Sequence, residues 1–442
     1  MERKYFGTDG IRGIVPFELS PEFAVRIGKA AQNVLGQSDS SCVIGGDTRL
    51  STDLIKSALA AGIASAGGNV FDAGVIPTPG ISYLINHFSL AYGGVVSASH
   101  NPFEYNGIKF FDGQGYKLSD ETEYEIEVHI DSLEFRDVDP GCVGRIFEMA
   151  DAQDIYADYL ASFIKEESGL KVAFDCANGA TSIVTRLMAE KAGLKAEFIN
   201  TEPDGKNINL NCGATHPEAL AHFVVKNGLD GGFAYDGDGD RVIAVDAEGQ
   251  QINGDHLIGF LISYYKQKGL LGQPVAVGTV MSNFGLEKKL LAEGVRFIRS
   301  KVGDRYVLEE MLLHDAVIGG EDSGHLILLD KARTGDGLLV SAVILSALAE
   351  EKLSFADLFS FEPVPRVLLN VKVRNKDRFS DDGEIQKAIA AAEAELEDRG
   401  RLVVRPSGTE PLVRVMVEAD DGDLAERIAR KLAELIEKRL GG

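Results

Sequence analysis

The hydrophobic positions along the chain repeat one pattern three times. In each unit a short apolar run predicts a buried strand, a stretch with helical spacing follows, glycine ends it, and a second apolar strand comes next. The three units cover residues 42–73, 170–200 and 274–299. Strands that alternate with helices in this way are typical of α/β domains with parallel or mixed sheets. We therefore expect three similar α/β domains, each with its ligand loops at the carboxyl ends of its strands.

The C-terminal part of the chain has a different order of elements. It begins after the proline-containing stretch 361–365 and predicts a strand, a helix, two strands and a closing helix, over 367–373, 382–398, 402–405, 412–418 and 423–440. This order predicts a smaller α+β domain with its helices on one face of the sheet. With 442 residues the chain is long enough for several domains. The expected domains are 1–150, 151–250, 251–365 and 366–442.

Composition and charge exclude several classes of protein. The chain is 45% hydrophobic and 26% charged, which is typical of a soluble globular protein. Its net charge of −23 argues against nucleic acid or an anionic membrane as a partner. The four cysteines lie far apart, so we expect neither a zinc site nor a disulfide framework. No apolar run reaches the length of a membrane span and no apolar leader opens the chain, which predicts a cytoplasmic protein.

A polar segment follows an apolar, glycine-rich run over 92–96 that predicts a buried strand. Residues 97–102 are Ser-Ala-Ser-His-Asn-Pro, so two hydroxyls, an imidazole and an amide come together where the strand ends. Pro102 prevents the strand from continuing. A serine at such a place can be a nucleophile, or its hydroxyl can bond the backbone of an ordinary turn. The pattern alone does not choose between Ser97 and Ser99.

Carboxylates and glycines alternate in the segment 236–241, which is Asp-Gly-Asp-Gly-Asp-Arg and lies between two predicted strands. Three carboxylates spaced in this way can converge on one hard cation, because glycine permits a tight backbone. An EF-hand loop would need glycine and glutamate where this chain has Arg241 and Ala247. An exposed acidic turn is the alternative, but repulsion among the carboxylates disfavours it. The sequence therefore predicts a magnesium site formed by Asp236, Asp238 and Asp240.

Two further loops carry clusters of polar side chains. Residues 319–325, Gly-Gly-Glu-Asp-Ser-Gly-His, have the groups that bind sugar hydroxyls, although the same pattern also fits a polar hairpin turn. Residues 405–411, Arg-Pro-Ser-Gly-Thr-Glu-Pro, are followed by Arg414 and predict a phosphate cradle. A capped turn with a surface arginine is the alternative for this second loop. The segment 6–13 places Arg12 among small turn-forming residues, which suits a loop that brings a cation to a ligand.

These segments, in this order and spacing, closely resemble the α-D-phosphohexomutase superfamily over essentially the whole chain. The segments 6–13, 97–102 and 405–411 are most similar to its bacterial phosphoglucosamine mutase branch, which interconverts glucosamine 6-phosphate and glucosamine 1-phosphate. Asp322 is a departure, because that branch usually has glutamine between the glutamate and the serine. The phosphomannomutase/phosphoglucomutase branch is therefore kept as an alternative.

The resemblance implies a role for single residues. Ser99 would be the phosphoserine and a Mg²⁺ ligand beside the three aspartates, and Arg241 would contact its phosphate. Arg12, His100, Lys109 and Lys301 match positions that line the family's cleft. Glu321 and Ser323 would bind sugar hydroxyls. His325 of the same loop is assigned to substrate binding, and apart from the resemblance its imidazole is a candidate acid or base. The remote phosphate would be bound by Arg405, Ser407, Gly408, Thr409 and Arg414.

The resemblance also implies a reaction and its partners. The phosphoserine would phosphorylate a hexosamine phosphate to a 1,6-bisphosphate, which turns over and returns its other phosphate. Glucosamine or glucose 1,6-bisphosphate would prime the enzyme, and a homodimer is compatible with the family. Four domains around a central cleft would exclude water, with the domain 366–442 acting as a lid. Two other classes are kept as alternatives, namely a phosphatase and a non-catalytic sugar-phosphate sensor.

Overall fold

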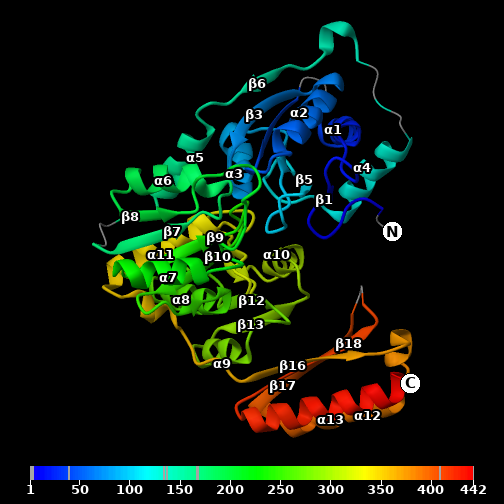
Figure 1. Cartoon of the computed structure of the whole chain (residues 1–442), viewed down its shortest axis with the longest axis vertical. Coiled ribbons are helices and arrows are strands. Elements are labelled where there is room, and N and C mark those ends of the chain that lie inside the picture. The colour runs from blue at the N-terminus through cyan, green and yellow to red at the C-terminus, as the bar shows by residue number, and fades with distance from the viewer. Residues whose placement is uncertain are drawn as a thin grey trace.

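The computed structural model of the chain describes residues 4–37, 40–132, 135, 138–165, 169–407 and 410–441. Three mixed sheets and one antiparallel sheet follow one another along the chain (Figure 1). Helices cover the mixed sheets, and the antiparallel sheet belongs to a separate C-terminal body. The expected fold class, with three α/β units and a smaller α+β unit, is confirmed.

The first sheet has the strand order β1-β5-β4-β2-β3-β6. Its strands are β1 (Ile11–Ile14), β2 (Ser41–Gly46), β3 (Asn69–Val75), β4 (Tyr92–Val96), β5 (Tyr105–Phe111) and β6 (Ile146–Glu148). The strands β4, β2, β3 and β6 are parallel, whereas β5 runs antiparallel to both β4 and β1. The accompanying helices are α1 (Pro21–Leu35), α2 (Thr52–Ser65), α3 (Thr78–Phe88) and α4 (Asp120–Ser132).

The second sheet has the order β11-β10-β9-β7-β8, and the third has the order β13-β12-β14-β15. The second is built from β7 (Lys171–Asp175), β8 (Lys195–Ile199), β9 (Gly231–Tyr235), β10 (Val242–Asp246) and β11 (Gln251–Ile252), with α5 (Ala152–Ala161), α6 (Thr181–Lys191) and α7 (Glu218–Asn227). The third is built from β12 (Val275–Thr279), β13 (Arg296–Ser300), β14 (Ile318–Gly320) and β15 (Leu326–Leu328), with α8 (Gly254–Gln267), α9 (Phe284–Ala292), α10 (Asp304–Leu313) and α11 (Gly337–Glu351).

One four-stranded arrangement recurs in the three mixed sheets. It reads β3-β2-β4-β5 in the first, β8-β7-β9-β10 in the second and β13-β12-β14-β15 in the third. In each case three parallel strands are followed by an antiparallel fourth strand. The loop between the third and fourth strands therefore occupies the same place in every unit. These loops contain residues 97–104, 236–241 and 321–325, which are the polar segments singled out from the sequence.

The first three units share buried apolar contacts, and helix α11 is central to them. It is apolar on all sides, and its residues from Gly337 to Leu348 are buried. A helix of this kind needs neighbours all round it, and α11 contacts β9, β10, β15 and α5. Within the part of the chain that the structure covers, no helix is both long and apolar enough to cross a membrane.

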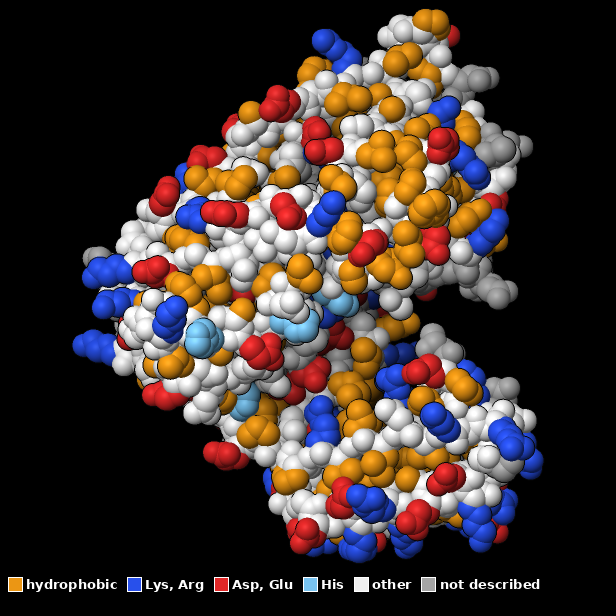
Figure 2. All heavy atoms as spheres, viewed as in Figure 1, with side chains coloured by type: hydrophobic (Ala, Val, Ile, Leu, Met, Phe, Trp, Pro, Cys, Tyr) orange, Lys and Arg blue, Asp and Glu red, His pale blue; other side chains and the backbone are white. Residues whose placement is uncertain are grey.

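The C-terminal body has its own apolar core, which its sheet and two helices enclose. Its elements are β16 (Arg366–Lys372), β17 (Gly400–Pro406), β18 (Leu412–Ala419), α12 (Gly383–Leu396) and α13 (Gly422–Leu440). The order β16-β18-β17 is fully antiparallel, and both helices lie on one face (Figure 1). Figure 2 shows the surface hollowed between this body and the rest of the molecule. The expected order of elements and the placement of both helices are confirmed.

The C-terminal body is joined to the third unit at a buried carboxylate, Glu418 of β18, whose side chain is fully enclosed. The Nε atoms of Arg366 and Arg401 each donate to it at 2.6 Å. It also accepts from the backbone N–H of Phe284 at the start of α9, at 3.2 Å. The two arginines donate in turn to backbone carbonyls of residues 280–282 in the third unit. Burial and the nearby Arg299 lower the pKa of Arg401 to about 10, and Glu418 acts in the opposite direction by favouring its charged form.

Replacing Glu418 with glutamine should weaken this junction strongly, because it removes the buried negative charge that both part-buried arginines contact at 2.6 Å. We expect the free energy of unfolding to fall by roughly 3–5 kcal/mol in urea titrations followed by circular dichroism. The matched control is Lys288→Gln, which removes an exposed ion pair with Asp420 across the same junction. The control should cost less than about 1 kcal/mol. Equal losses for both variants would contradict a central role for Glu418.

Candidate active site

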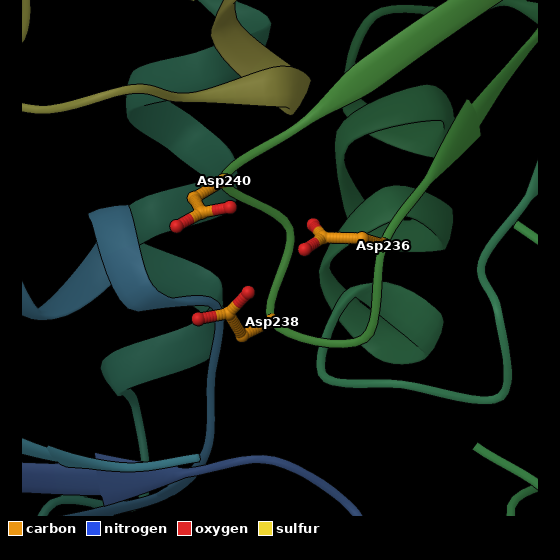
Figure 3. Close-up of side chains that lie close together, drawn as sticks. All are labelled: Asp236, Asp238 and Asp240. Atoms are coloured by element: carbon orange, nitrogen blue, oxygen red, sulfur yellow. The ribbon is translucent and has the colours of Figure 1, made fainter. Parts of the chain in front are cut away.

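The loops of the first three units meet in one place. Figure 3 shows the carboxylates of Asp236, Asp238 and Asp240 pointing toward one another from the loop between β9 and β10. Each offers an oxygen within 4.8 Å of the others, and all three side chains are buried. The Oγ atom of Ser99, from the first unit, donates to Oδ2 of Asp236 at 2.7 Å. Residues 137 positions apart in the chain are therefore in direct contact.

The backbone of Ser99 has a φ of +51°, which is uncommon for a residue with a side chain. This conformation aims the hydroxyl at the aspartates, where it is also 3.3 Å from Nδ1 of His100. Ser97 has a different place, since its Oγ donates to Asp47 at 2.6 Å and accepts from the backbone N–H of Ser99. Only Ser99 faces the aspartate cluster, and this distinguishes the two serines that the sequence pattern left equivalent.

A buried ion pair holds the Ser99 loop in this shape. Asp47 and Arg49 follow β2, are fully enclosed, and pair at 2.8 Å. Nη2 of Arg49 donates to the carbonyl oxygen of Ser99 at 2.8 Å, and Asn209 of the second unit donates to the same oxygen at 3.0 Å. Such enclosed, fully bonded groups resist rearrangement. Sequence reasoning missed these residues, because short charged segments such as 47–49 also occur in ordinary surface turns.

The aspartate cluster fits a divalent cation with oxygen ligands such as Mg²⁺. Oδ1 of Asp238 and Oδ1 of Asp240 are buried and have no hydrogen-bond partner within the described ranges. Carboxylate oxygens in such a position are the ligands that magnesium prefers. Lys109 partly balances the charge, since its Nζ lies 2.8 Å from Asp238 and 3.7 Å from Asp240. The structure thus brings the three predicted ligands and Ser99 together.

Electrostatics at the cluster follow from burial and from the crowding of like charges. Burial, together with the charges of Asp240 and Asp238, raises the pKa of Asp236 well above its usual range. Burial acts against ionisation of Asp240 too, but Lys109 and His325 outweigh it and lower the pKa of that carboxyl. Burial and the cations Arg241 and Arg12 lower the pKa of His100, so its neutral form is favoured beside the Ser99 hydroxyl.

Two predicted arginines approach the same region. The backbone N–H of Arg241 donates to Asp236 at 3.1 Å, and its Nε is buried with no partner among the residues the structure covers. A guanidinium left in this way is suited to an anion placed beside the aspartates. Arg12 donates to Oδ1 of Asn101 at 3.1 Å and pairs with Asp9. Arg12 therefore contacts the Ser99 loop, and Arg241 contacts the aspartate that Ser99 faces.

The loop over 321–325 lies next to the aspartates and comes from the third unit. An isolated bridge links the backbones of Arg241 and His325, and Nδ1 of His325 is 3.7 Å from Asp240. Glu321 accepts from the backbone N–H of Gly303 at 3.0 Å. Although burial acts to lower the pKa of His325, the carboxylates of Asp240 and Asp304 raise it. Asp322 lies 3.8 Å from Arg366 of the junction with the C-terminal body.

The predicted phosphate cradle lies at the end of the β17–β18 hairpin. Arg405 and Arg414 are directly opposite each other in the antiparallel register. Like charges in such a pair are destabilising unless an anion lies between them, which favours phosphate binding. The carbonyl of Ser407 accepts from Nζ of Lys376, a cation that sequence reasoning did not identify. Gly408 and Thr409, which were also predicted here, lie outside the described residues.

Lys301 is a predicted site residue whose described contact, with Tyr306, does not involve another predicted site residue. Its side chain is exposed, and its Nζ lies 5.4 Å from the ring centre of Tyr306. It stands two residues before Gly303, whose N–H contacts Glu321, so it belongs to the rim beside the 321–325 loop. Ser323 of that loop is also exposed at the surface.

Comparison with protein families finds four models in chain order. They are alpha/beta/alpha domains I, II and III and the C-terminal domain of phosphoglucomutase/phosphomannomutase, and they match residues 3–137, 154–249, 253–363 and 368–435. Together they account for most of the chain, and each includes one of the loops described above.

Individual proteins are similar over the full length. The phosphoglucosamine mutase of Carboxydothermus hydrogenoformans is 46% identical over 441 residues, covering 98% of this chain and 99% of that protein. The phosphoglucosamine mutase of Clostridioides difficile is 44% identical over 446 residues, covering 99% and 100%. Among solved structures, a Burkholderia thailandensis phosphoglucomutase/phosphomannomutase family protein has a TM-score of 0.83 at 24% identity, covering 98% of this chain and 97% of that chain. Aspergillus fumigatus N-acetylphosphoglucosamine mutase, solved with GlcNAc-6P and magnesium, has a TM-score of 0.69 at 16% identity, covering 99% and 96%.

Replacing Asp238 or Asp240 with asparagine should abolish magnesium binding, because each removes a charged oxygen ligand. We expect isothermal titration with MgCl₂ to show binding in the unchanged chain and none in these variants. Affinity should rise with pH, since the raised pKa of Asp236 means that a proton must leave before the cation binds. The matched control is Asp246→Asn, which alters a buried aspartate of β10 that only caps a turn. Loss of binding in the control as well would argue against a site specific to the cluster.

Proposed function

The chain belongs to the phosphoglucomutase/phosphomannomutase family, and from that membership we propose that it acts as a phosphoglucosamine mutase. It interconverts glucosamine 6-phosphate and glucosamine 1-phosphate through a phosphoserine and a 1,6-bisphosphate. The observation that carries the proposal is the contact of Ser99 Oγ with Asp236 inside the buried aspartate cluster. A hydroxyl held beside three candidate magnesium ligands is suited to carry a transferable phosphate.

The first step moves one phosphoryl group. The bond between phosphorus and Ser99 Oγ breaks as a bond forms to the free hydroxyl of the sugar phosphate, and the hydroxyl proton leaves to a base. Neutral His325 is our proposed acceptor, because its imidazole belongs to the 321–325 loop and its Nδ1 lies 3.7 Å from Asp240. In the second step the bisphosphate has reversed its orientation in the site, and its other phosphoryl group is transferred to Ser99. The sum is an isomerisation that releases no inorganic phosphate.

Charge and position supply most of the catalysis in phosphoryl transfer. Bound Mg²⁺, held by Asp236, Asp238, Asp240 and the phosphoserine, would supply positive charge to the transferring phosphate. Arg241 would bind an oxygen of that phosphate with its buried Nε. His100, which is favoured neutral, lies within 3.3 Å of Ser99 Oγ and would hold the hydroxyl proton of the unphosphorylated serine.

Substrate binding would involve two loops on opposite sides of the hollow in Figure 2. Glu321 and Ser323 would bind sugar hydroxyls, with Lys301 on the rim, while Arg12 and Lys109 line the donor side. The non-reacting phosphate would bind to the C-terminal body, through Arg405, Ser407, Gly408, Thr409 and Arg414. Since either end of the bisphosphate must fit this cradle, arginines that recognise phosphate alone serve better than groups that recognise one orientation.

The same proposal covers the setting of the enzyme. A 1,6-bisphosphate of glucosamine or glucose would prime Ser99, and the A. fumigatus relative solved with glucose 1,6-bisphosphate supports a site of that size. We also propose that the protein acts in the cytoplasm and forms a homodimer. The domains 1–150, 151–250, 251–365 and 366–442 would enclose the substrate.

Intact-mass measurement and a coupled assay test the proposal. We expect a phosphorylated fraction of the purified chain that disappears in Ser99→Ala together with nearly all activity on glucosamine 6-phosphate. Ser97→Ala is the matched control, because its hydroxyl supports the loop without facing the aspartates, and it should keep the added phosphate. Faster turnover of mannose or glucose phosphates would favour the phosphomannomutase/phosphoglucomutase alternative. Net release of phosphate would indicate a phosphatase, and full function without Ser99 would indicate a sensor.

A further inference from the structure

An ion pair between Lys117 and Asp304 lies next to His325 of the candidate active site. Neither residue belongs to the motifs that predicted the site. Lys117 follows β5 in the first unit, and Asp304 is the first residue of α10 in the third. Their side chains are only 11% and 15% exposed. Nζ of Lys117 also lies 2.7 Å from Oδ1 of Asp9. Burial acts to lower the pKa of Lys117, but Asp304 and Asp9 raise it, so the lysine is charged.

In the first unit, this pair is linked through Asp9 to the loop that carries Ser99, the proposed phosphoryl donor. Asp9, which Lys117 contacts, pairs with Arg12 and lies 3.4 Å from Nζ of Lys109. Arg12 in turn donates to Asn101, two residues beyond Ser99. The position of Lys117 is thereby transmitted to the loop that carries the proposed phosphoserine.

In the third unit, the pair lies next to His325, the proposed proton acceptor. Oδ2 of Asp304 lies 3.8 Å from Nε2 of His325, and the other ring nitrogen lies 3.7 Å from Asp240. The imidazole therefore stands between two carboxylates from different units. Gly335 packs closely against the ring, since a Cβ at that position would come within 2.4 Å of Nε2. A cavity of about 250 Å³ also borders His325, so packing alone does not confine the ring on every side.

These contacts close into a ring of alternating acidic and basic side chains that spans three units. Each neighbouring pair in the ring is within ion-pair distance. In order, its members are Asp304, Lys117, Asp9, Lys109, Asp240 and His325. Lys117 and Asp304 form the segment of the ring that joins the first unit to the third.

Neighbouring residues repeat the same connection. Arg305, next to Asp304, lies 2.8 Å from Glu123 of α4 and donates to the carbonyl of Leu118, next to Lys117. Two consecutive residues of α10 thus contact two consecutive residues of the first unit. The first and third units are therefore joined here by several polar contacts and not by one ion pair alone.

We propose that Lys117 and Asp304 are positioning residues that set the Ser99 loop and the His325 loop in register for phosphoryl transfer. The proposal rests on the proposed mutase function. Donor and acceptor loops come from separate units, and in-line transfer requires their groups to be placed within a fraction of an ångström. The Lys117–Asp304 ion pair joins the first unit to the third next to His325, and it thereby meets that requirement.

Kinetics of single and double variants test the proposal. Lys117→Met and Asp304→Asn should each lower kcat about 100-fold, with KM for glucosamine 6-phosphate changed less than about 3-fold. The double variant should lose much less than the product of the two single losses, because both changes break the Lys117–Asp304 ion pair that joins the two units. Lys117→Arg, which keeps the charge, should recover most of the rate. Losses that multiply in the double variant would overturn the proposal.

A matched control separates positioning from general stability. Lys56 is a buried lysine that pairs with Asp72 at 2.9 Å elsewhere in the first unit. Lys56→Met should lower the melting temperature but leave kcat unchanged. If it lowers kcat as far as Lys117→Met does, the effect at Lys117 is one of stability and the positioning role is wrong.

A second readout needs no turnover. In the ¹⁵N-labelled full chain, the imidazole resonances of His325 can be assigned by comparison with His325→Gln. We expect them to shift in Lys117→Met and Asp304→Asn and to stay in place in Lys56→Met. Unchanged resonances in the first two variants would overturn the proposal. An unchanged chain that fails to isomerise glucosamine phosphates would instead overturn the proposed function, while the resonances still decide whether the pair positions His325.

Discussion

Buried negative charge is the constraint on which the rest of this structure depends. Asp236, Asp238 and Asp240 are almost completely enclosed and close enough to repel one another strongly. Burial of such a cluster is tolerable only if cations surround it. Lys109 supplies one of them from the first unit and Arg241 another from the second, and the orphaned carboxylate oxygens leave room for a divalent ion. The folding of three separate units around one loop follows from this need for balancing charge.

Repetition of one strand arrangement explains how the site is assembled. The Ser99 loop, the aspartate loop and the 321–325 loop each follow the third parallel strand of their own unit. No single unit holds both the phosphate carrier and the groups that would bind its acceptor. Catalysis therefore depends on how the units are held against one another, and the interfaces between them carry as much of the function as the loops do. The buried apolar helix α11 and the charged ring around Lys117 meet that demand by different means, one through packing and one through charge.

The sequence predicted those features that are local in the chain. Alternating aspartates and glycines, or two arginines around a hydroxyl turn, carry their chemistry within ten residues, and the structure brings the three aspartates together. The choice of Ser99 over Ser97 could not be made locally, because it depends on a positive φ and on an aspartate 137 residues away. Asp47, Arg49 and Lys117 were missed for a related reason. A single charged residue in a polar segment looks the same whether it is solvated or buried in an ion pair.

The attachment of the C-terminal body suits a reaction in which a bisphosphate intermediate must reorient. This body has its own apolar core, so its folding does not depend on apolar residues of the other units. Its junction is polar and centred on Glu418, whose two arginines reach backbone carbonyls in the third unit. Arg366 of that junction also lies near Asp322 in the sugar loop, so the angle of the body and the shape of the loop are linked through one guanidinium. The proposed phosphate cradle, which would hold either phosphate of a reorienting sugar, is therefore carried on a body with its own apolar core.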